Sequence, residues 1–176
     1  KGSFKSKKQL FVVHRLDRDT SGVLIFAKSI EAKENLKLQW KNVRKRYVAV
    51  VHGVLKEKNG TITSYLTENE DYEVFSVRDS RKGELAKTRY QVIKEAKKFS
   101  LLEIELLTGK KNQIRVHFSE KGHPIVGDNK YGKKGEPKSR LALHSHHLTF
   151  RHPHSGKELT FEAELPGFFK SYFDHQ

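Results

Sequence analysis

The sequence predicts an α+β fold with a mostly antiparallel sheet. Segments with strand character outnumber those with helix character, and several of the strand segments are separated by short turns, which favours hairpins over the helical crossovers of a parallel sheet. The 176 residues contain no internal repeat and no long linker. We therefore expect residues 1–176 to form a single domain.

The first expected elements are a strand and a helix. The uninterrupted apolar run over 23–27 predicts a buried strand. The Ser29 hydroxyl can cap a helix that continues to about Asn42. Three residues mark the buried face of this helix by their spacing: Leu36, Trp40 and Val43.

The middle of the chain predicts strands separated by turns. The expected strands cover 47–51, 61–66, 88–93 and 101–107, with a short strand near 74–77 inside the polar segment 67–83. In the last long strand apolar and acidic side chains alternate, which predicts one buried and one solvated face. The apolar face holds Leu102, Ile104 and Leu106.

The final third predicts a short helix, a loop and a closing hairpin. The helix starts near Asn112, buries Ile114 and Phe118 on one face and ends at Gly122. The segments that follow are a lysine- and glycine-rich loop over about 128–140, strands over 141–150 and 159–163, and a last helical turn containing Phe168, Phe169 and Tyr172.

Composition excludes several classes of protein. The chain has no cysteine, so disulfides, thiolate catalysis and cysteine-bound zinc are excluded. No apolar run approaches the about 20 residues of a membrane helix, and the basic residues 1–8 lack the apolar core of a signal peptide. We expect a cytoplasmic protein that does not enter a membrane. The chain also lacks methionine, even at position 1, so we expect further residues before Lys1.

The charge points to a polyanionic partner. Lysine and arginine total 35 against 21 acidic residues, a net charge of +14. Solubility alone could explain the excess, but local clustering favours nucleic acid. The clusters are Lys1, Lys5, Lys7 and Lys8; Lys41, Arg44, Lys45 and Arg46; Lys110, Lys111 and Arg115; and Lys130, Lys133, Lys134, Lys138 and Arg140.

Residues 14–22 form the strongest candidate for a catalytic loop. Asp17 lies between Arg15 and Arg18, whose positive charges can keep its carboxylate ionised. Thr20 and Ser21 can bond to the loop backbone and fix its shape. By itself, an aspartate beside arginines is more often a structural ion pair than a catalyst.

Four blocks of the chain resemble the RluA-type pseudouridine synthases, in the family's order. They cover residues 14–22, 45–53, 107–132 and 140–153. The first block matches the pattern H-R-L-D-x-x-T-S-G and the second matches K-x-Y-x-A-x-V-x-G. In the third, Lys110 and Asn112 depart from the family's arginine and histidine. The N-K-P-containing strand block that precedes the first pattern in the family is not found in residues 1–10, so we expect an incomplete N-terminus.

The resemblance implies a fold, a reaction and a site. It implies a mixed, mostly antiparallel and bent sheet, and isomerisation of uridine to pseudouridine in structured ribosomal or transfer RNA by a monomer without cofactor or metal. Asp17 would be the nucleophile, Tyr47 would stack on the uracil, and Arg115 would form a buried ion pair with Asp17. The expected substrate and RNA contacts are His14, Arg15, Arg18, Thr20, Arg46, Lys110, Gln113 and Leu143.

Two other functions remain open from the residues. A non-catalytic RNA-binding module could use the same fold. A metal-dependent nuclease could use Asp17, Asp19 and the five histidines between 144 and 154, although the neighbouring arginines would repel a cation from the two aspartates. Strand alternation places His144 and His146 on one face and His147 on the other, with no acidic residue nearby in sequence. We therefore expect structural or RNA-facing histidines without a metal.

Overall fold

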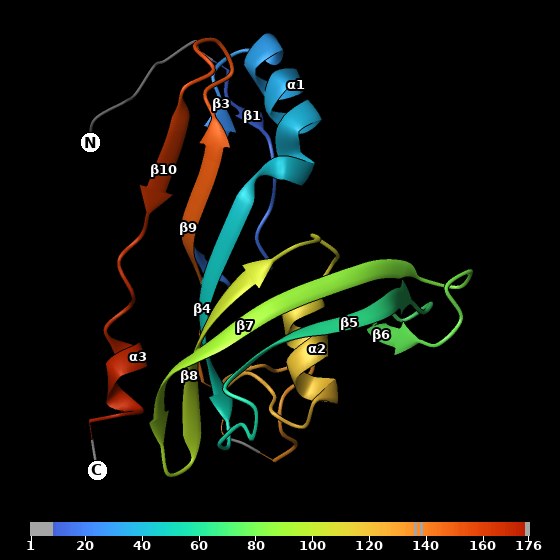
Figure 1. Cartoon of the computed structure of the whole chain (residues 1–176), viewed down its shortest axis with the longest axis vertical. Coiled ribbons are helices and arrows are strands. Elements are labelled where there is room, and N and C mark those ends of the chain that lie inside the picture. Colours follow the sequence, from blue (N-terminus) through green and yellow to red (C-terminus); the bar gives the residue numbers. More distant parts are fainter. Residues whose placement is uncertain (1–8, 136, 138, 175–176) are drawn as a thin grey trace.

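The structure is a computed structural model that describes residues 9–135, 137 and 139–174 (Figure 1). In chain order its elements are β1 (Phe11–Val12), β2 (Ser21–Gly22), β3 (Phe26–Ala27), α1 (Ile30–Gln39), the 3₁₀ helix η1 (Trp40–Asn42), β4 (Arg44–His52), β5 (Asn59–Glu68), β6 (Val74–Val77), β7 (Glu84–Ala96), β8 (Phe99–Leu106), α2 (Gln113–Glu120), β9 (Leu143–Arg151), β10 (Glu158–Glu162) and α3 (Phe168–Ser171). The basic cluster at Lys1–Lys8 and the side chain of Lys138 lie outside the described residues.

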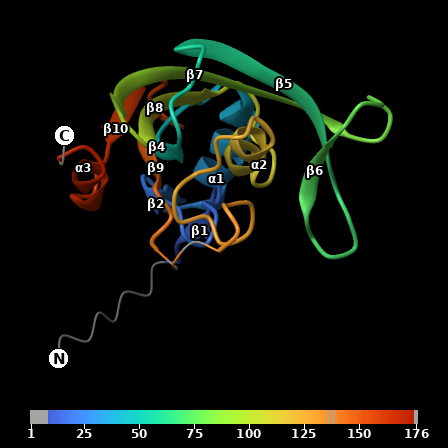
Figure 2. The same ribbon diagram turned by 90° about the horizontal axis from the view of Figure 1, so that it is seen from below.

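The predicted mixed, mostly antiparallel sheet is confirmed. Its strand order is β10-β9-β4-β8-β7-β5-β6, with every neighbouring pair antiparallel, and β2 adds to β9 in parallel. The register of β7 on β8 shifts between Val92 and Lys94, and such an irregularity increases local twist. The long strands β5 and β7 arch away from β9 and β10, with α2 beneath the arch (Figure 2).

The main core lies where β4 and β8 pair beneath α2. The predicted alternation of β8 is confirmed, since Leu102 and Ile104 have no exposed surface. Ile114 and Phe118 of α2 are buried in the same cluster. Helix α2 ends as predicted, because Gly122 adopts a φ of +82° that other residues resist.

A second core lies under α1. Ser29 accepts a hydrogen bond from the Ala32 backbone at 3.1 Å, which confirms the predicted cap. The helix ends at Gln39 and η1 carries the helical path to Asn42. Leu36 and Val43 are buried against β9, as their spacing predicted, while Trp40 is partly exposed. Among the described residues, no helix has the length and apolar character needed to cross a membrane.

The expected buried strand over 23–27 is wrong. Only Phe26 and Ala27 lie in a strand, β3, which pairs with β1 in a separate two-stranded sheet. Strand β2, which ends at Gly22 just before the segment, pairs with β9 of the main sheet. Leu24 and Phe26 are 42% and 46% exposed. An apolar run favours a strand, but it does not specify which strand will pair with it. Here the chain leaves the main sheet after Gly22 and enters the two-stranded sheet at Phe26. Strand β1 also precedes the loop over 14–22, where the sequence suggested that a strand is missing.

The expected separation of His146 from His147 is also wrong. Arg46 of β4 opposes His147 of β9, whereas Tyr47 opposes Ser145, so His146 is an extra residue in a β-bulge. A bulge interrupts the two-residue alternation of side chains. The donor atoms of both histidines lie within 4.8 Å of one another and of a carboxylate oxygen of Glu162, which arrives on β10.

His117 should make stability depend on pH. The ring is almost fully buried, with its nitrogens 2.8 Å from Thr88 Oγ1 and 3.0 Å from Ser64 Oγ. Burial lowers its pKa from 6.5 to about 4. Because the folded pKa lies below the unfolded one, the stabilisation is present above about pH 6.5 and declines as the pH falls toward 4. The free energy of unfolding of the wild-type protein should therefore fall by about 2 kcal/mol between about pH 7.5 and pH 5.

Urea unfolding at the two pH values measures this cost. His117→Gln should show a smaller loss of unfolding free energy on acidification than wild type. The control, His154→Gln, alters an exposed histidine and should keep the wild-type difference. An identical pH dependence in His117→Gln and wild type would contradict the assignment.

Candidate active site

The loop that carries Asp17 is held by backbone contacts to the main sheet. The Thr20 N–H donates to the Asp17 carbonyl at 3.0 Å, and the Val23 N–H donates to the Ser145 carbonyl at 2.9 Å. The expected side-chain bonds to the loop backbone are not found. Ser21 Oγ instead lies 2.8 Å from His144 Nδ1, and Thr20 Oγ1 is buried without a partner among the described residues. The loop is therefore fixed against β9.

Gly22 permits this attachment. Its φ is +118°, and a Cβ at this position would lie 2.1 Å from the carbonyl oxygen of Ser145. Gly22→Ala should lower the free energy of unfolding by more than about 1 kcal/mol and displace the Asp17 loop, because both the backbone angle and the close approach resist a side chain. Urea denaturation and the activity of the folded protein measure the two effects.

The control for Gly22→Ala is Gly156→Ala. Gly156 also has a positive φ, +68°, but open space surrounds its Cβ position. It therefore reports the cost of the backbone angle alone. Equal stability and activity in the two variants would show that the close approach to β9 is unimportant.

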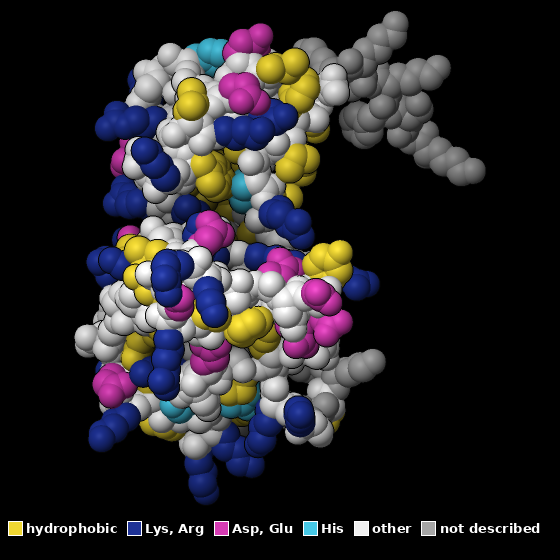
Figure 3. Space-filling model, turned by 90° about the vertical axis from the view of Figure 1, so that its right-hand side faces the viewer, with side chains coloured by type: hydrophobic (Ala, Val, Ile, Leu, Met, Phe, Trp, Pro, Cys, Tyr) yellow, Lys and Arg dark blue, Asp and Glu magenta, His cyan; other side chains and the backbone are white. Residues whose placement is uncertain are grey.

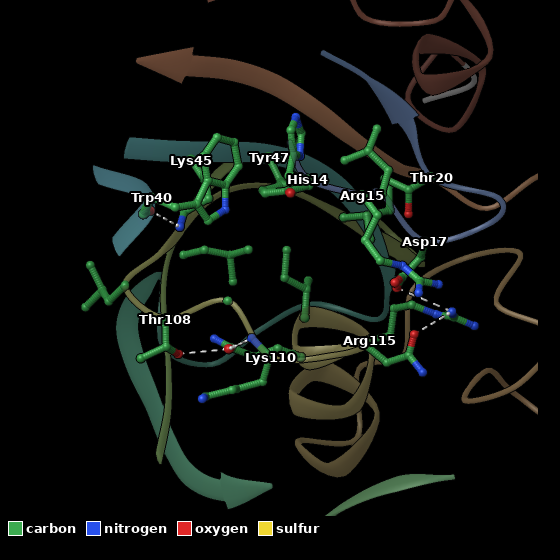
Figure 4. Close-up of a pocket in the computed structure, with 18 of the residues that line it drawn as sticks. His14, Arg15, Asp17, Thr20, Trp40, Lys45, Tyr47, Thr108, Lys110 and Arg115 are labelled. Carbon is green, nitrogen blue, oxygen red and sulfur yellow. Dashed lines mark hydrogen bonds and ion pairs between the residues drawn. The ribbon is translucent and has the colours of Figure 1, made fainter. Parts of the chain in front are cut away.

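Arg115 links Asp17 to a second carboxylate. Its Nη1 lies 3.5 Å from Asp17 Oδ2, while its Nε and Nη2 donate to the two oxygens of Asp128 at 2.8 and 2.7 Å. The Asp128 side chain is fully buried, whereas 25% of the Asp17 side chain is exposed. The bidentate partner of Arg115 is therefore Asp128. Asp17, whose contact with Arg115 can be followed in Figure 4, is the looser and more exposed partner.

The surroundings keep both ends of this network charged. Burial alone would raise the pKa of Asp128, but hydrogen bonds from Arg115 and from the backbone N–H groups of Tyr131 and Lys130 outweigh it and hold that pKa below its usual value. Burial would lower the pKa of Arg115, but the two carboxylates outweigh it and raise that pKa. Arg115 is thus a fixed positive charge that faces Asp17.

A cavity of about 720 Å³ opens beside this network. Its lining includes Asp17, Tyr47, Arg115 and Leu143. It lies where the molecule narrows between the α1 and α2 halves, a level at which Lys and Arg side chains gather (Figure 3). The structure therefore brings the three predicted catalytic residues to one cavity, although they are far apart in the chain.

Tyr47 enters the cavity as a neutral phenol. Burial raises its pKa to about 12, the negative charge of Asp17 acts in the same direction, and a hydrogen bond with Ser145 acts against them. A phenol with this pKa stays protonated at neutral pH. The ring can supply a flat apolar surface and a hydroxyl, and it is a poor resting-state base.

The opposite end of the cavity is aromatic and basic (Figure 4). The His14 ring lies 4.5 Å from the Trp40 ring and accepts a hydrogen bond from the Ile25 backbone at 3.1 Å. Lys45 Nζ lies 5.8 Å from the Trp40 ring. Burial lowers the pKa of His14 and of Lys45. His14 is thus a neutral ring that supports the loop as well as the cavity wall.

Gln113 organises the turn that follows β8. Its Oε1 accepts from Thr108 Oγ1 at 2.8 Å and from the Lys110 backbone at 3.0 Å, and its Nε2 donates to the Lys87 carbonyl and to Thr88 Oγ1. The side chain is 2% exposed and its polar atoms are engaged. It shapes the cavity wall, and a direct hydrogen bond to RNA would require it to release one of these partners.

Comparisons with known proteins show which family the chain belongs to. The family model of the RNA pseudouridylate synthases matches residues 1–120. This chain belongs to the RNA pseudouridylate synthase family. The RluA-type resemblance is confirmed by relatives that include the ribosomal large subunit pseudouridine synthase D of Nitrosomonas europaea, which is 38% identical over 166 residues, 88% of this chain and 48% of the relative.

Other relatives show what share of their own length this chain covers. The uncharacterized RNA pseudouridine synthase YlyB of Bacillus subtilis is 41% identical over 159 residues, 88% of this chain and 52% of YlyB. The chain thus spans about half the length of the curated relatives it matches. The solved structure of human RNA pseudouridylate synthase domain containing 4 superimposes with a TM-score of 0.77 at 27% identity and covers 91% of this chain and 73% of that one.

The expected RNA contacts fall in different places relative to the cavity. His14, Arg15, Thr20, Lys110, Gln113 and Leu143 line it. Arg15 is exposed at its edge, and the Lys110 ammonium pairs with Glu84. Arg18 and Arg46 are exposed outside the lining, and Arg46 lies 3.9 Å from Glu103 on the neighbouring strand. The ion pair of Arg115 with Asp17 that the resemblance implied is present, whereas Arg15 and Arg18 are exposed and do not take its place.

The sequence analysis did not anticipate the contacts of two residues beside the candidate site, Asp128 and Asn112. Asp128 belongs to the matched block over 107–132, but the sequence of that block does not reveal that the Asp128 carboxylate binds Arg115. Asn112, where the family has histidine, accepts from Arg115 Nη1 at 3.2 Å and donates to the Tyr131 hydroxyl at 3.1 Å. Asn112 has a left-handed backbone with a φ of 53°, which asparagine tolerates better than most residues, but the sequence alone carried no signal for its two side-chain contacts.

Proposed function

We propose that this chain converts specific uridines of structured ribosomal or transfer RNA to pseudouridine, with Asp17 as the nucleophile. The observation that carries the proposal is the ion pair of Asp17 with Arg115 at a cavity whose wall includes the Tyr47 ring. Family membership supports the reaction class. The name of the Nitrosomonas relative supports a ribosomal substrate.

The reaction is an isomerisation that needs no external reactant. The C1′–N1 bond breaks, the uracil turns, a C1′–C5 bond forms, and the proton lost from C5 is balanced by one gained at N1. Asp17 attacks C1′ or promotes departure of the base there, and the ion pair with Arg115 orients its carboxylate. We assign the neutral Tyr47 ring to stacking on the flipped uracil.

The basic rim suits an RNA backbone around a flipped nucleotide. Arg15, Lys41 and Lys110 line the cavity, and the net charge is +14. Cations at these positions can contact phosphates without reading sequence. The assignments of His14, Thr20 and Leu143 as substrate contacts rest on the same cavity.

Release of tritium from C5-labelled uridine tests the proposal. Purified protein is incubated with labelled ribosomal and transfer RNA transcripts, and pseudouridine in the product is mapped chemically. The expected result is tritium release, with a mapped pseudouridine in one of the transcripts. RNA binding without release from any transcript would favour the non-catalytic module, and chelator-sensitive strand cleavage would favour the nuclease. Sedimentation of the same sample tests the expected monomer.

A further inference from the structure

A cluster outside the cavity has the composition of a metal site. His146, His147 and Glu162, here called the His–Glu cluster, lie on the adjacent strands β9 and β10 (Figure 1). None of the three lines the cavity beside Asp17. The uridine reaction proposed above does not use them.

The donor atoms are spaced as ligands of one small cation. His147 Nε2 lies 3.0 Å from Glu162 Oε2, and His146 Nε2 lies 3.5 Å from Glu162 Oε1. Zinc–nitrogen and zinc–oxygen bonds of about 2.0–2.1 Å in a tetrahedron place ligand atoms about 3.3 Å apart. The two histidine–carboxylate separations bracket this value, and all the donor atoms lie within 4.8 Å of one another, so side-chain rotations could bring them around one ion.

The backbone prepares this arrangement. The bulge at His146 brings two consecutive side chains to the same side, and Glu162 is the register partner of His147 on β10. The two imidazole rings are 4.2 Å apart at an interplanar angle of 79°. Because strands fix all three Cα positions, the cluster loses little freedom when it binds an ion.

The hydrogen bond of His146 leaves the correct nitrogen available. Its Nδ1 lies 2.7 Å from the carbonyl oxygen of Ala163, which can only accept, so Nδ1 carries the proton. A backbone carbonyl on the far nitrogen is the usual support of a metal-binding histidine. His144 differs, because Ser21 and Ala163 occupy both of its nitrogens.

Charge and access also permit a cation. The Glu162 side chain is 61% exposed, which leaves an open approach from solvent. Arg46 opposes His147 across the strands, and its guanidinium lies 3.9 Å from Glu103, which offsets its positive charge. Without an ion, His147 Nε2 can donate to Glu162, since its Nδ1 is buried with no partner among the described residues.

We propose that the His–Glu cluster binds one divalent transition-metal cation of the zinc type, through two imidazole nitrogens and one carboxylate oxygen. This donor set suits Zn²⁺, Co²⁺ or Ni²⁺ better than Mg²⁺ or Ca²⁺, which prefer oxygen ligands. A fourth position is left for water. The bound ion would tie the edge strand β10 to β9, so its role is to stabilise this edge of the sheet.

Calorimetric titration of the metal-free protein with Zn²⁺ tests the site, and Co²⁺ reports its geometry through the visible spectrum. Wild type should bind one ion per chain and gain thermal stability. Glu162→Gln and His147→Gln should each weaken the affinity at least about tenfold. Glu162→Gln alters an exposed side chain, so it tests the site even if a histidine variant folds poorly.

His154→Gln is the matched control, because it removes an exposed histidine from the neighbouring turn. It should retain wild-type affinity and the metal-dependent rise in Tm. Stoichiometric binding that survives in both cluster variants, or no stoichiometric binding at millimolar Zn²⁺, would overturn the proposal. Tritium release from RNA is a separate readout, so failure of the metal site and failure of the proposed reaction are distinguishable.

Discussion

Asp17→Asn is expected to abolish pseudouridine formation, lowering kcat by about 10⁴-fold or more. Asparagine preserves the size of the side chain, but its neutral amide can neither attack C1′ nor stabilise positive charge that develops there. The loop should keep its shape, because the Asp17 contact that closes it uses the backbone carbonyl. Tritium release under single-turnover conditions, alongside filter binding of the same RNA, separates lost chemistry from lost binding.

Asp19→Asn is the matched control for this substitution. Asp19 is an exposed residue two positions further along the same loop. Substitutions at such positions shift free energies by about 0.5 kcal/mol or less, so activity should stay within a few-fold of wild type. Wild-type turnover by Asp17→Asn, or equal losses in the two variants, would rule out Asp17 as the nucleophile.

Asp128→Asn is expected to have the second largest effect. It removes the charge that faces Arg115 and leaves that guanidinium buried with a weaker partner. Breaking one partner of a buried pair costs about 3 kcal/mol or more of unfolding free energy. The folded fraction should also lose about 10–100-fold in kcat, as is typical when a group that orients a reactive residue is changed. RNA affinity should change little, because Asp128 is buried.

Glu158→Gln tests whether any lost ion pair would have the same effect. Glu158 pairs with Arg44 at 3.0 Å, and both side chains are more than half exposed. Such pairs contribute about 0–1 kcal/mol, so stability and kcat should remain close to wild type. If Asp128→Asn weakened RNA binding with unchanged kcat, its assigned positioning of Arg115 and Asp17 would be incorrect.

Local patterns predicted the elements of the fold well. Alternating polarity placed Leu102 and Ile104 in the core, and the Ser29 cap was recognised from local chemistry. Local rules failed at 23–27, where the chain leaves one sheet for another, and at the bulge containing His146. Both errors concern pairing partners. A hydrophobic pattern with a period of 2 or 3.6 residues indicates which residues share one face of a strand or helix. It does not indicate which other strand that element will pair with.

The residues of the candidate site and the pairing of Arg115 with Asp17 were predicted, but the contact of Arg115 with Asp128 was not. The matched blocks implied that Asp17, Tyr47 and Arg115 belong to one site, and in the structure all three residues line the same cavity. The resemblance implied the ion pair of Arg115 with Asp17, which the structure contains, whereas sequence adjacency alone had suggested Arg15 and Arg18 as the cations that hold Asp17. Charges adjacent in sequence can point to solvent at little cost, so adjacency is weak evidence for an ion pair.

The sequence by itself determined the family, the mostly antiparallel α+β fold, the strong positive charge and the residue types available for chemistry. Only the tertiary structure decided that Asp128 forms a bidentate ion pair with Arg115, that Tyr47 is a partly buried, neutral phenol, and that Glu162 lies beside two histidines. These properties depend on desolvation and on distances between groups far apart in the chain. Desolvation and long-range distance exist only once β2, β9, β10 and α2 have packed around the central strands.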